Sequence, residues 1–178
     1  MTDQQIDFKN YLDLIKKVDD KFDQIYTAEK QSFSCQKGCH ACCLPDLSVS
    51  KIEKEFVKDF LNQNEEKVVQ LREIESSNPH NNTRCSFLSA YGECVIYPVR
   101  PLICRSHGAP ILIPEKNNEI DVCPLNFRDK DPQALDGELK INIKIVNTIL
   151  ALINITAFPD SNEQRFELKV DQILSDES

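Results

Sequence analysis

Eight cysteines in a chain of 178 residues constrain this protein more than any other feature of its sequence. Their use depends on the compartment, because disulfides persist in oxidising compartments and free or metal-bound thiols prevail in the cytoplasm. The first residues are polar and acidic, without the basic and apolar segments of a secretory signal. No apolar run approaches the roughly 18 residues of a membrane span. We therefore expect a cytoplasmic protein that does not enter a membrane and whose cysteines bind metal.

Four of the cysteines lie within nine residues, at Cys35, Cys39, Cys42 and Cys43. If this segment is helical, the four thiols fall within one face about 100° wide. If it forms turns, Cys39 and Cys42 still have the two-residue gap that lets two thiolates reach one metal ion. Gly38 and Pro45 are compatible with either geometry. Both interpretations predict a metal site.

The other four cysteines are widely spaced, at Cys85, Cys94, Cys104 and Cys123. The four closely spaced cysteines and the four widely spaced ones together supply eight thiolates. Eight thiolates suit two tetrahedral sites, or one cluster and a structural zinc. Four thiolates around a divalent ion leave a negative charge that Arg84, Arg100 or Arg105 could offset. His107, three residues after Cys104, is a candidate extra ligand.

The ordered cysteine pattern resembles the YkgJ-type cysteine-cluster family, which is named for zinc or iron chelation. The resemblance covers residues 35–128 and includes Cys-x3-Cys-x2-Cys-Cys, Cys-x-Phe-Leu and Gly-x-Cys-x-Ile-Tyr-x-x-Arg-Pro-x-x-Cys-Arg. It implies metal chelation. We take all eight cysteines as candidate ligands, with Tyr97, Arg100 and Arg105 as candidate residues around them. The resemblance implies no particular reaction, although related cysteine patterns occur in flagellin lysine methylases.

Spacing alone does not choose between zinc and a [4Fe–4S] cluster. An all-thiolate tetrahedral site suits zinc and needs no assembly machinery. The Cys123-Pro124 pair is similar to the Cys-Pro of ferredoxins, which would fit an iron–sulfur site with Cys123 or Cys104 as fourth ligand. We favour zinc and keep iron as the alternative.

Charge and glycine content exclude two classes of ligand. The chain has 21 basic and 29 acidic residues, a net charge of −8 and a pI near 4.9. Nucleic-acid binding needs a clustered basic patch, so we expect no nucleic-acid partner. Only four glycines are present, which excludes glycine-rich phosphate loops. The length suits one domain over residues 1–178.

Apolar periodicity predicts a mainly α protein, in which amphipathic helices surround an irregular, cysteine-rich metal-binding centre over residues 35–128. One helix is expected within residues 5–33, a second after a capping box at Ser50, and a third over residues 138–156. At most a small hairpin is expected, between residues 109–113 and 120–122. Residues 160–178 form an acidic tail with a short apolar docking element. The centre has few periodic apolar residues, so we expect its order to depend on metal.

The leading hypothesis is a metal-chelating protein without enzymatic activity. A second is an iron–sulfur redox protein, an oxidoreductase component or an accessory to a protein-modifying enzyme. A third is an interaction module for a protein partner, in which metal only staples the surface together. No catalytic residue can be assigned, because no nucleophile–base arrangement emerges from the spacing.

Overall fold

Six α-helices form most of the regular structure in the residues that the computed structural model describes, which are 6–36, 38–77, 83–161 and 165–175. They are α1 (Lys9–Ala28), α2 (Lys51–Asn62), α3 (Glu65–Ser77), α4 (Leu102–Ser106), α5 (Ile143–Ala157) and α6 (Val170–Leu174). Short 3-10 turns lie at Lys30–Ser32, Tyr97–Val99, Pro114–Lys116, Pro132–Ala134 and Gly137–Leu139. The protein is therefore mainly α, as the periodicity predicted.

Two small sheets accompany the helices, where the sequence predicted at most one hairpin. The expected hairpin is present as β2 (Ile111–Ile113) antiparallel to β3 (Glu119–Asp121), and β4 (Ile141–Asn142) adds to β2 in parallel. The second sheet pairs β1 (Ser48–Ser50) with β5 (Arg165–Glu167). Strands of two or three residues are too short to show alternation, and β1 and β5 are far apart in sequence, so the periodicity could not predict them.

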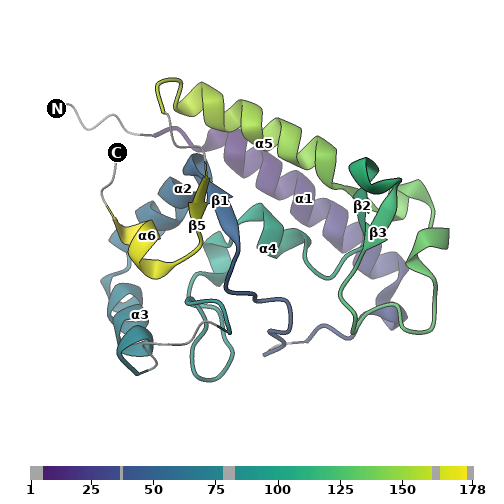
Figure 1. Ribbon diagram of the computed structural model, residues 1–178, viewed down its shortest axis with the longest axis horizontal. Helices are drawn as coiled ribbons and strands as arrows, with labels where there is room; N and C mark the ends of the chain where they lie inside the picture. The colour runs from purple at the N-terminus through teal and green to yellow at the C-terminus, as the bar shows by residue number, and fades with distance from the viewer. Residues whose placement is uncertain (1–5, 37, 78–82, 162–164, 176–178) are drawn as a thin grey trace.

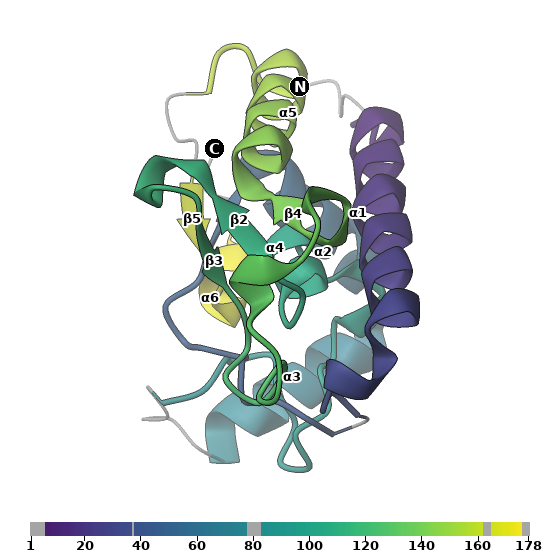
Figure 2. The same ribbon diagram turned by 90° about the vertical axis from the view of Figure 1, so that its right-hand side faces the viewer.

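Helices α1 and α5 lie side by side along one edge of the molecule (Figures 1 and 2). Tyr11, Leu14 and Val18 of α1 are buried against Ile52 of α2 and Leu150 of α5. These apolar residues follow the three- and four-residue spacing of an amphipathic helix, so the sequence dictates which face of α1 is buried. The expected helix within residues 5–33 is α1 followed by the turn at Lys30–Ser32.

The cysteine-bearing stretch contributes more to the core than its lack of periodicity suggested. Phe87, Val95, Ile96 and Val99 are buried in one cluster with residues of α2, α3, β5 and α6. Their spacing is irregular because they stand on turns rather than on a helix, so no period reveals them. The centre is thus partly held by apolar packing, whereas we had expected metal to be its main source of order.

Two side chains set the starts of helices. Ser50 and Glu53 form the predicted capping box at the start of α2, with the Ser50 amide donating to the Glu53 carboxylate over 2.8 Å. Asn142 caps α5 by accepting from the Ile145 amide. Asn142 is also the last residue of strand β4, so the helix expected over residues 138–156 begins only at Ile143.

The acidic tail carries β5 and α6, which return to the core. Phe166, Leu168, Val170 and Ile173 are buried in the cluster that also holds Phe87. These are the residues that the sequence indicated as a docking element. Both elements lie beside α2 and β1 in Figure 1.

Candidate metal centre

The first cysteine cluster, residues 35–43, forms successive turns and not a helix. The Cys39 amide donates to the Gln36 carbonyl and the Cys43 amide donates to the His40 carbonyl, each over 3.0 Å. Gly38 has a φ of +86°, a left-handed conformation that glycine adopts without strain. The four thiols therefore do not form a single helical stripe, and they divide between two groups.

One group, the outer thiol group, consists of Cys35, Cys39, Cys42 and Cys123. The segments that carry Cys35 and Cys123 are joined by hydrogen bonds, since the Phe127 amide donates to the Ser32 carbonyl and the Ser34 hydroxyl donates to the Leu125 carbonyl, both over 2.7 Å. These bonds bring the last cysteine of the chain to the first.

Asn126 lies at the junction of these two segments and is almost fully buried. Its side-chain oxygen accepts from the Ser34 amide, and its Nδ2 lies 2.8 Å from the Gly108 carbonyl and 3.3 Å from Cys35 Sγ. A Cβ at Gly108 would stand 3.2 Å from the same sulfur, and the φ of +97° there also favours glycine. The amide side chain thus fixes the position of the Cys35 thiol.

Electrostatic interactions support the membership of the outer thiol group. Burial raises the pKa of the Cys35 thiol, the hydrogen bond with Asn126 lowers it, and the charges of Cys123, Cys39 and Cys42 raise it further. All three sulfurs therefore lie within electrostatic range of Cys35, because charge interactions decay with distance.

The other group, the inner thiol group, consists of Cys43, Cys85, Cys94 and Cys104. The Cys85 amide donates to the Cys43 carbonyl over 3.1 Å, which ties the end of the first cluster to the second. Residues Leu88 and Cys94 form an isolated antiparallel bridge, and Cys104 lies on the short helix α4. The thiols of Cys85, Cys94 and Cys104 pack against the core cluster around Phe87.

Two members of the inner group lie in matching turns. The Leu88 amide donates to the Cys85 carbonyl, and the Tyr97 amide donates to the Cys94 carbonyl. Within each turn the thiol accepts a hydrogen bond from the backbone of the second residue on, Phe87 for Cys85 and Ile96 for Cys94. Such N–H···S bonds favour the thiolate, which is the form that binds metal.

The same turns explain a motif that the sequence contains twice. Cys85-Ser-Phe-Leu and Cys94-Val-Ile-Tyr both read Cys-x-apolar-apolar, and the third residue of each, Phe87 and Ile96, is buried to 0% and 1% exposure. Each turn aims its sulfur at a backbone amide while it anchors the adjacent side chain in the core. This repeat is the signal from which the turns could have been found.

Burial is the main influence on the pKa values of three inner thiols, those of Cys85, Cys94 and Cys104. It raises the pKa of Cys94 to about 11 and that of Cys104 to about 12, since a thiolate is poorly solvated there. The charges of Cys85, Cys94 and Glu53 raise the pKa of Cys104 further, and Arg100 lowers it. Protein alone therefore keeps the Cys94 and Cys104 thiols protonated, and a cation would be needed to hold them as thiolates.

The adjacent Cys42 and Cys43 connect the two groups. Their side chains share a hydrogen bond that raises the pKa of Cys42 and lowers the pKa of Cys43. The charges of Cys85, Cys94 and Cys104 act in turn on Cys43. Neighbours in the chain thus belong to different groups, a division that spacing could not reveal.

Of the expected surrounding residues, Arg100 is the one whose charge acts on thiols in both groups. It lowers the pKa values of Cys42, Cys94 and Cys104. Its guanidinium stacks on the half-exposed ring of Tyr97 at 4.2 Å, and its Nε is buried without a hydrogen-bond partner. The Nε of Arg84, beside Cys85, is unpartnered in the same way.

Arg105 supports the loop that leads into α4, the helix that carries Cys104. Its guanidinium pairs with Asp19 of α1 at 2.7 Å and donates to the carbonyls of Arg100 and Pro98. Glu53 adds a second support, because its carboxylate accepts from the Leu102 amide at the start of α4 over 3.0 Å. Together these residues hold the loop and helix that carry Cys104.

Two histidines near the cysteines, His107 and His40, each place one ring nitrogen against a backbone carbonyl. Nδ1 of His107 lies 3.0 Å from the Ile103 carbonyl, one turn back on α4. Nδ1 of His40 lies 2.9 Å from the Gly38 carbonyl, and a Cβ at Gly92 would stand only 2.6 Å from this ring nitrogen. Both rings are thus held against local backbone.

The donor set suits a soft or borderline metal ion. All eight cysteines are free thiols, and thiolates are the ligands preferred by zinc and iron–sulfur clusters. Among the described residues, however, no three His, Cys, Asp or Glu side chains form a group that could hold a metal ion as they stand. The thiols are neighbours and do not form a ready-made site, so metal binding would have to draw them together.

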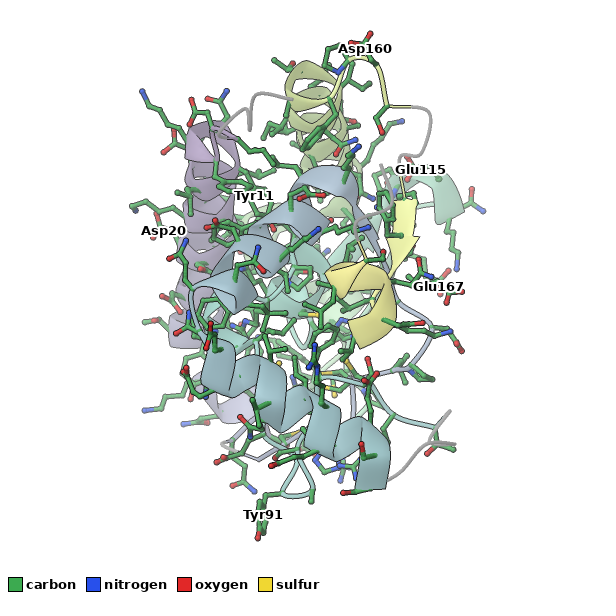
Figure 3. The ribbon with its side chains drawn as sticks, turned by 90° about the vertical axis from the view of Figure 1, so that its left-hand side faces the viewer. Tyr11, Asp20, Tyr91, Glu115, Asp160 and Glu167 are labelled. Atoms are coloured by element: carbon green, nitrogen blue, oxygen red, sulfur yellow. The ribbon has the colours of Figure 1, made fainter. Side chains whose placement is uncertain are left out.

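Figure 3 shows the sulfur atoms in the middle and lower part of the molecule, between the ends marked by Asp160 and Tyr91.

Thiols gathered in this way are characteristic of cysteine-cluster metal-binding proteins. Comparison with known protein families matches residues 34–124, just over half of the chain, to the CxxCxxCC family, described as a "putative zinc- or iron-chelating domain". The chain belongs to this family, as its cysteine pattern suggested. Searches of curated proteins and of solved structures gave no significant match. Within the described residues, no helix has both the length and the apolar character needed to cross a membrane.

Proposed function

We propose that this protein chelates about two divalent metal ions in the cytoplasm, one in each thiol group, and that zinc is preferred to iron. The observation that carries the proposal is the division of eight free thiols into two groups of four, the number that a tetrahedral site needs. In this proposal Cys35, Cys39, Cys42 and Cys123 hold one ion, and Cys43, Cys85, Cys94 and Cys104 hold the other.

Local electrostatics supports this assignment. Four thiolates around a divalent ion carry a formal charge of −2, and the buried, unpartnered Nε atoms of Arg84 and Arg100 are available to hydrogen-bond to sulfur. The amide donors at Phe87 and Ile96 stabilise two thiolates of the inner group, and Asn126 does so for Cys35. A bound ion would supply structural cross-linking, since four protein ligands leave no open position for a substrate.

A second candidate is an iron–sulfur redox protein with a [4Fe–4S] cluster in the outer thiol group. It is favoured by one observation, that Cys123, which precedes Pro124 as in ferredoxins, lies beside the Cys-x3-Cys-x2-Cys run. Such a cluster would exchange single electrons with a protein partner. The same ligands would be used, so only the bound element distinguishes the two proposals.

Elemental analysis of freshly purified protein, combined with its ultraviolet–visible spectrum, tests both candidates. The protein should be prepared anaerobically in reductant from cells supplied with both zinc and iron. We expect a colourless protein with about two zinc ions per chain. Broad absorption near 400 nm that bleaches with dithionite, together with bound iron, would favour the second candidate. Bound metal no higher than in a Cys39→Ser/Cys104→Ser double variant would contradict both.

A further inference from the structure

The two thiol groups differ in how far solvent can reach them. Cys35 and Cys39 of the outer group are exposed, whereas Cys42 has the same intermediate exposure as the four members of the inner group. Every member of the inner group is partly buried, and Cys85, Cys94 and Cys104 pack against the core cluster. Only Cys123, at 9% exposure, gives the outer group a buried member.

The groups also differ in how their backbones are held. Three inner-group cysteines, Cys85, Cys94 and Cys104, stand on segments bonded to the core, as shown by the Val95 amide that donates to the Phe87 carbonyl and by the Glu53 contact to α4. Cys39 and Cys42 stand on turns closed by local hydrogen bonds. Short local turns open more readily than segments with buried side chains.

Exposure and mobility of the ligands control the exchange of a metal ion. For zinc to move, an entering ligand such as a free thiolate or a nitrogen chelator must form a bond to the ion as a protein thiolate leaves. The released thiolate then takes a proton from solvent, and the ion remains divalent, so no electron is transferred. An exposed ligand lets the entering group approach, whereas a ligand packed in the core does not.

We propose that the outer thiol group is an exchange site, which gives up and regains divalent zinc as cargo, while the inner thiol group retains its ion as part of the fold. This inference rests on the proposed function. It adds that two sites with the same ligand chemistry have different roles, one in zinc exchange and one in the stability of the fold. The partners of the exchange are molecules with accessible thiolate or nitrogen ligands.

Release of zinc to a chromogenic chelator tests the proposal on the complete, zinc-loaded chain. With excess 4-(2-pyridylazo)resorcinol, we expect two phases of equal amplitude whose rates differ by about tenfold or more. In the Cys39→Ser variant the fast phase should be lost and the slow phase kept. A single phase with both ions released at one rate would overturn the exchange proposal and leave the proposed function intact. A chain with no bound zinc would overturn both.

Thiol labelling during the same reaction identifies the group that opens first, without any substitution. Trypsin does not cleave the Arg100–Pro101 bond, so residues 85–105 form one peptide that reports on three inner cysteines. Residues 31–37 and 117–128 form separate peptides that report on Cys35 and Cys123. Iodoacetamide should modify the latter two peptides in the fast phase and the 85–105 peptide in the slow one. Labelling in the reverse order, or of all three together, would contradict the assignment.

Discussion

The inner and outer thiol groups offer the same four ligands and are built in different ways. The inner group consists of turns whose apolar residues, Phe87 and Ile96, are core residues, so its sulfurs are positioned by folding itself. The outer group joins a surface turn to a segment about 90 residues further on, and the buried amide of Asn126 is the connection. The identity of the ligands therefore does not determine how much a bound metal contributes to the stability of the fold. That contribution depends on the packing and hydrogen bonds around the ligands.

The largest expected difference comes from removing one cysteine of each group. Cys104→Ser should remove one metal ion and destabilise the fold by several kcal/mol, because zinc in structural sites supplies about 10–16 kcal/mol and this thiol lies against the core. Cys39→Ser should also remove one ion but cost much less, since its turn is exposed. Elemental analysis and denaturant unfolding measure the two quantities. Equal losses of stability would remove the distinction between the groups.

The pH dependence of metal-free, reduced protein should reflect the inner group. The pKa values of Cys94 and Cys104 are raised to about 11 and about 12, above the ordinary value near 9. The unfolded chain therefore releases these protons first, and the free energy of unfolding falls as pH rises from about 9 to about 12, at up to about 1.4 kcal/mol per pH unit for each thiol. Zinc-loaded protein, whose ligands are already thiolates, should show a smaller fall. Equal slopes in both forms would show that these thiols are not ligands.

Substitutions of Arg105 and Arg100 should have different effects on stability and on metal affinity. Arg105→Ala should destabilise the protein by about 2–4 kcal/mol, because it leaves Asp19 and two carbonyls without their partner, while the metal content stays the same. Arg100→Ala should cost less stability and weaken metal binding, since its charge acts on three thiols. Competition with a zinc chelator measures the affinity. Lower affinity in Arg105→Ala alone would reverse these roles.

Asn126 can be compared with Asn154, an equally buried residue that bonds to the backbone at the start of α2. Asn126 and Asn154 are both 3% exposed, and Asn154 accepts from the Ile52 amide at the start of α2. Each Asn→Ala variant should lose about 1–3 kcal/mol of stability, from buried groups left unbonded. Asn126→Ala should speed the loss of metal more than Asn154→Ala does, because Asn126 bonds to the Cys35 thiol. Equal release rates in the two variants would show that Asn126 supports the fold alone.

The smallest effect is expected at His107. Four thiols complete each proposed tetrahedral site, so neither site needs an imidazole ligand. His107→Gln should therefore leave the metal content and the release rates unchanged. A loss of bound metal in this variant would restore the histidine as a ligand and reduce the number of cysteines needed.

Much of the helical fold could be predicted from the sequence, because it depends on local signals. The apolar spacing of α1 and the capping box of Ser50 and Glu53 are each contained in a few neighbouring residues. The pairing of β1 with β5 and the late start of α5 depend on segments far apart in the chain. Those contacts have no local signature.

The cysteines could be identified from the sequence, but their grouping could not. Cys42 and Cys43 are adjacent and act on different neighbours, and Cys123 lies nearer to Cys35 than to Cys104 in its interactions. These relations depend on how the turns fold and on Asn126, whose position three residues after Cys123 carries no recognisable pattern. The division of the eight cysteines into two groups of four therefore depends on tertiary contacts and not on their spacing in the sequence.

The most direct test of this division is the cadmium-113 NMR spectrum of the complete chain loaded with the metal in place of zinc. Cadmium keeps the preference of zinc for tetrahedral thiolate sites and reports the number and type of ligands at each ion. We predict two resonances in the region of four sulfur ligands, of which Cys39→Ser alters one and Cys94→Ser the other. A single resonance, or two resonances that Cys39→Ser alters equally, would contradict the account.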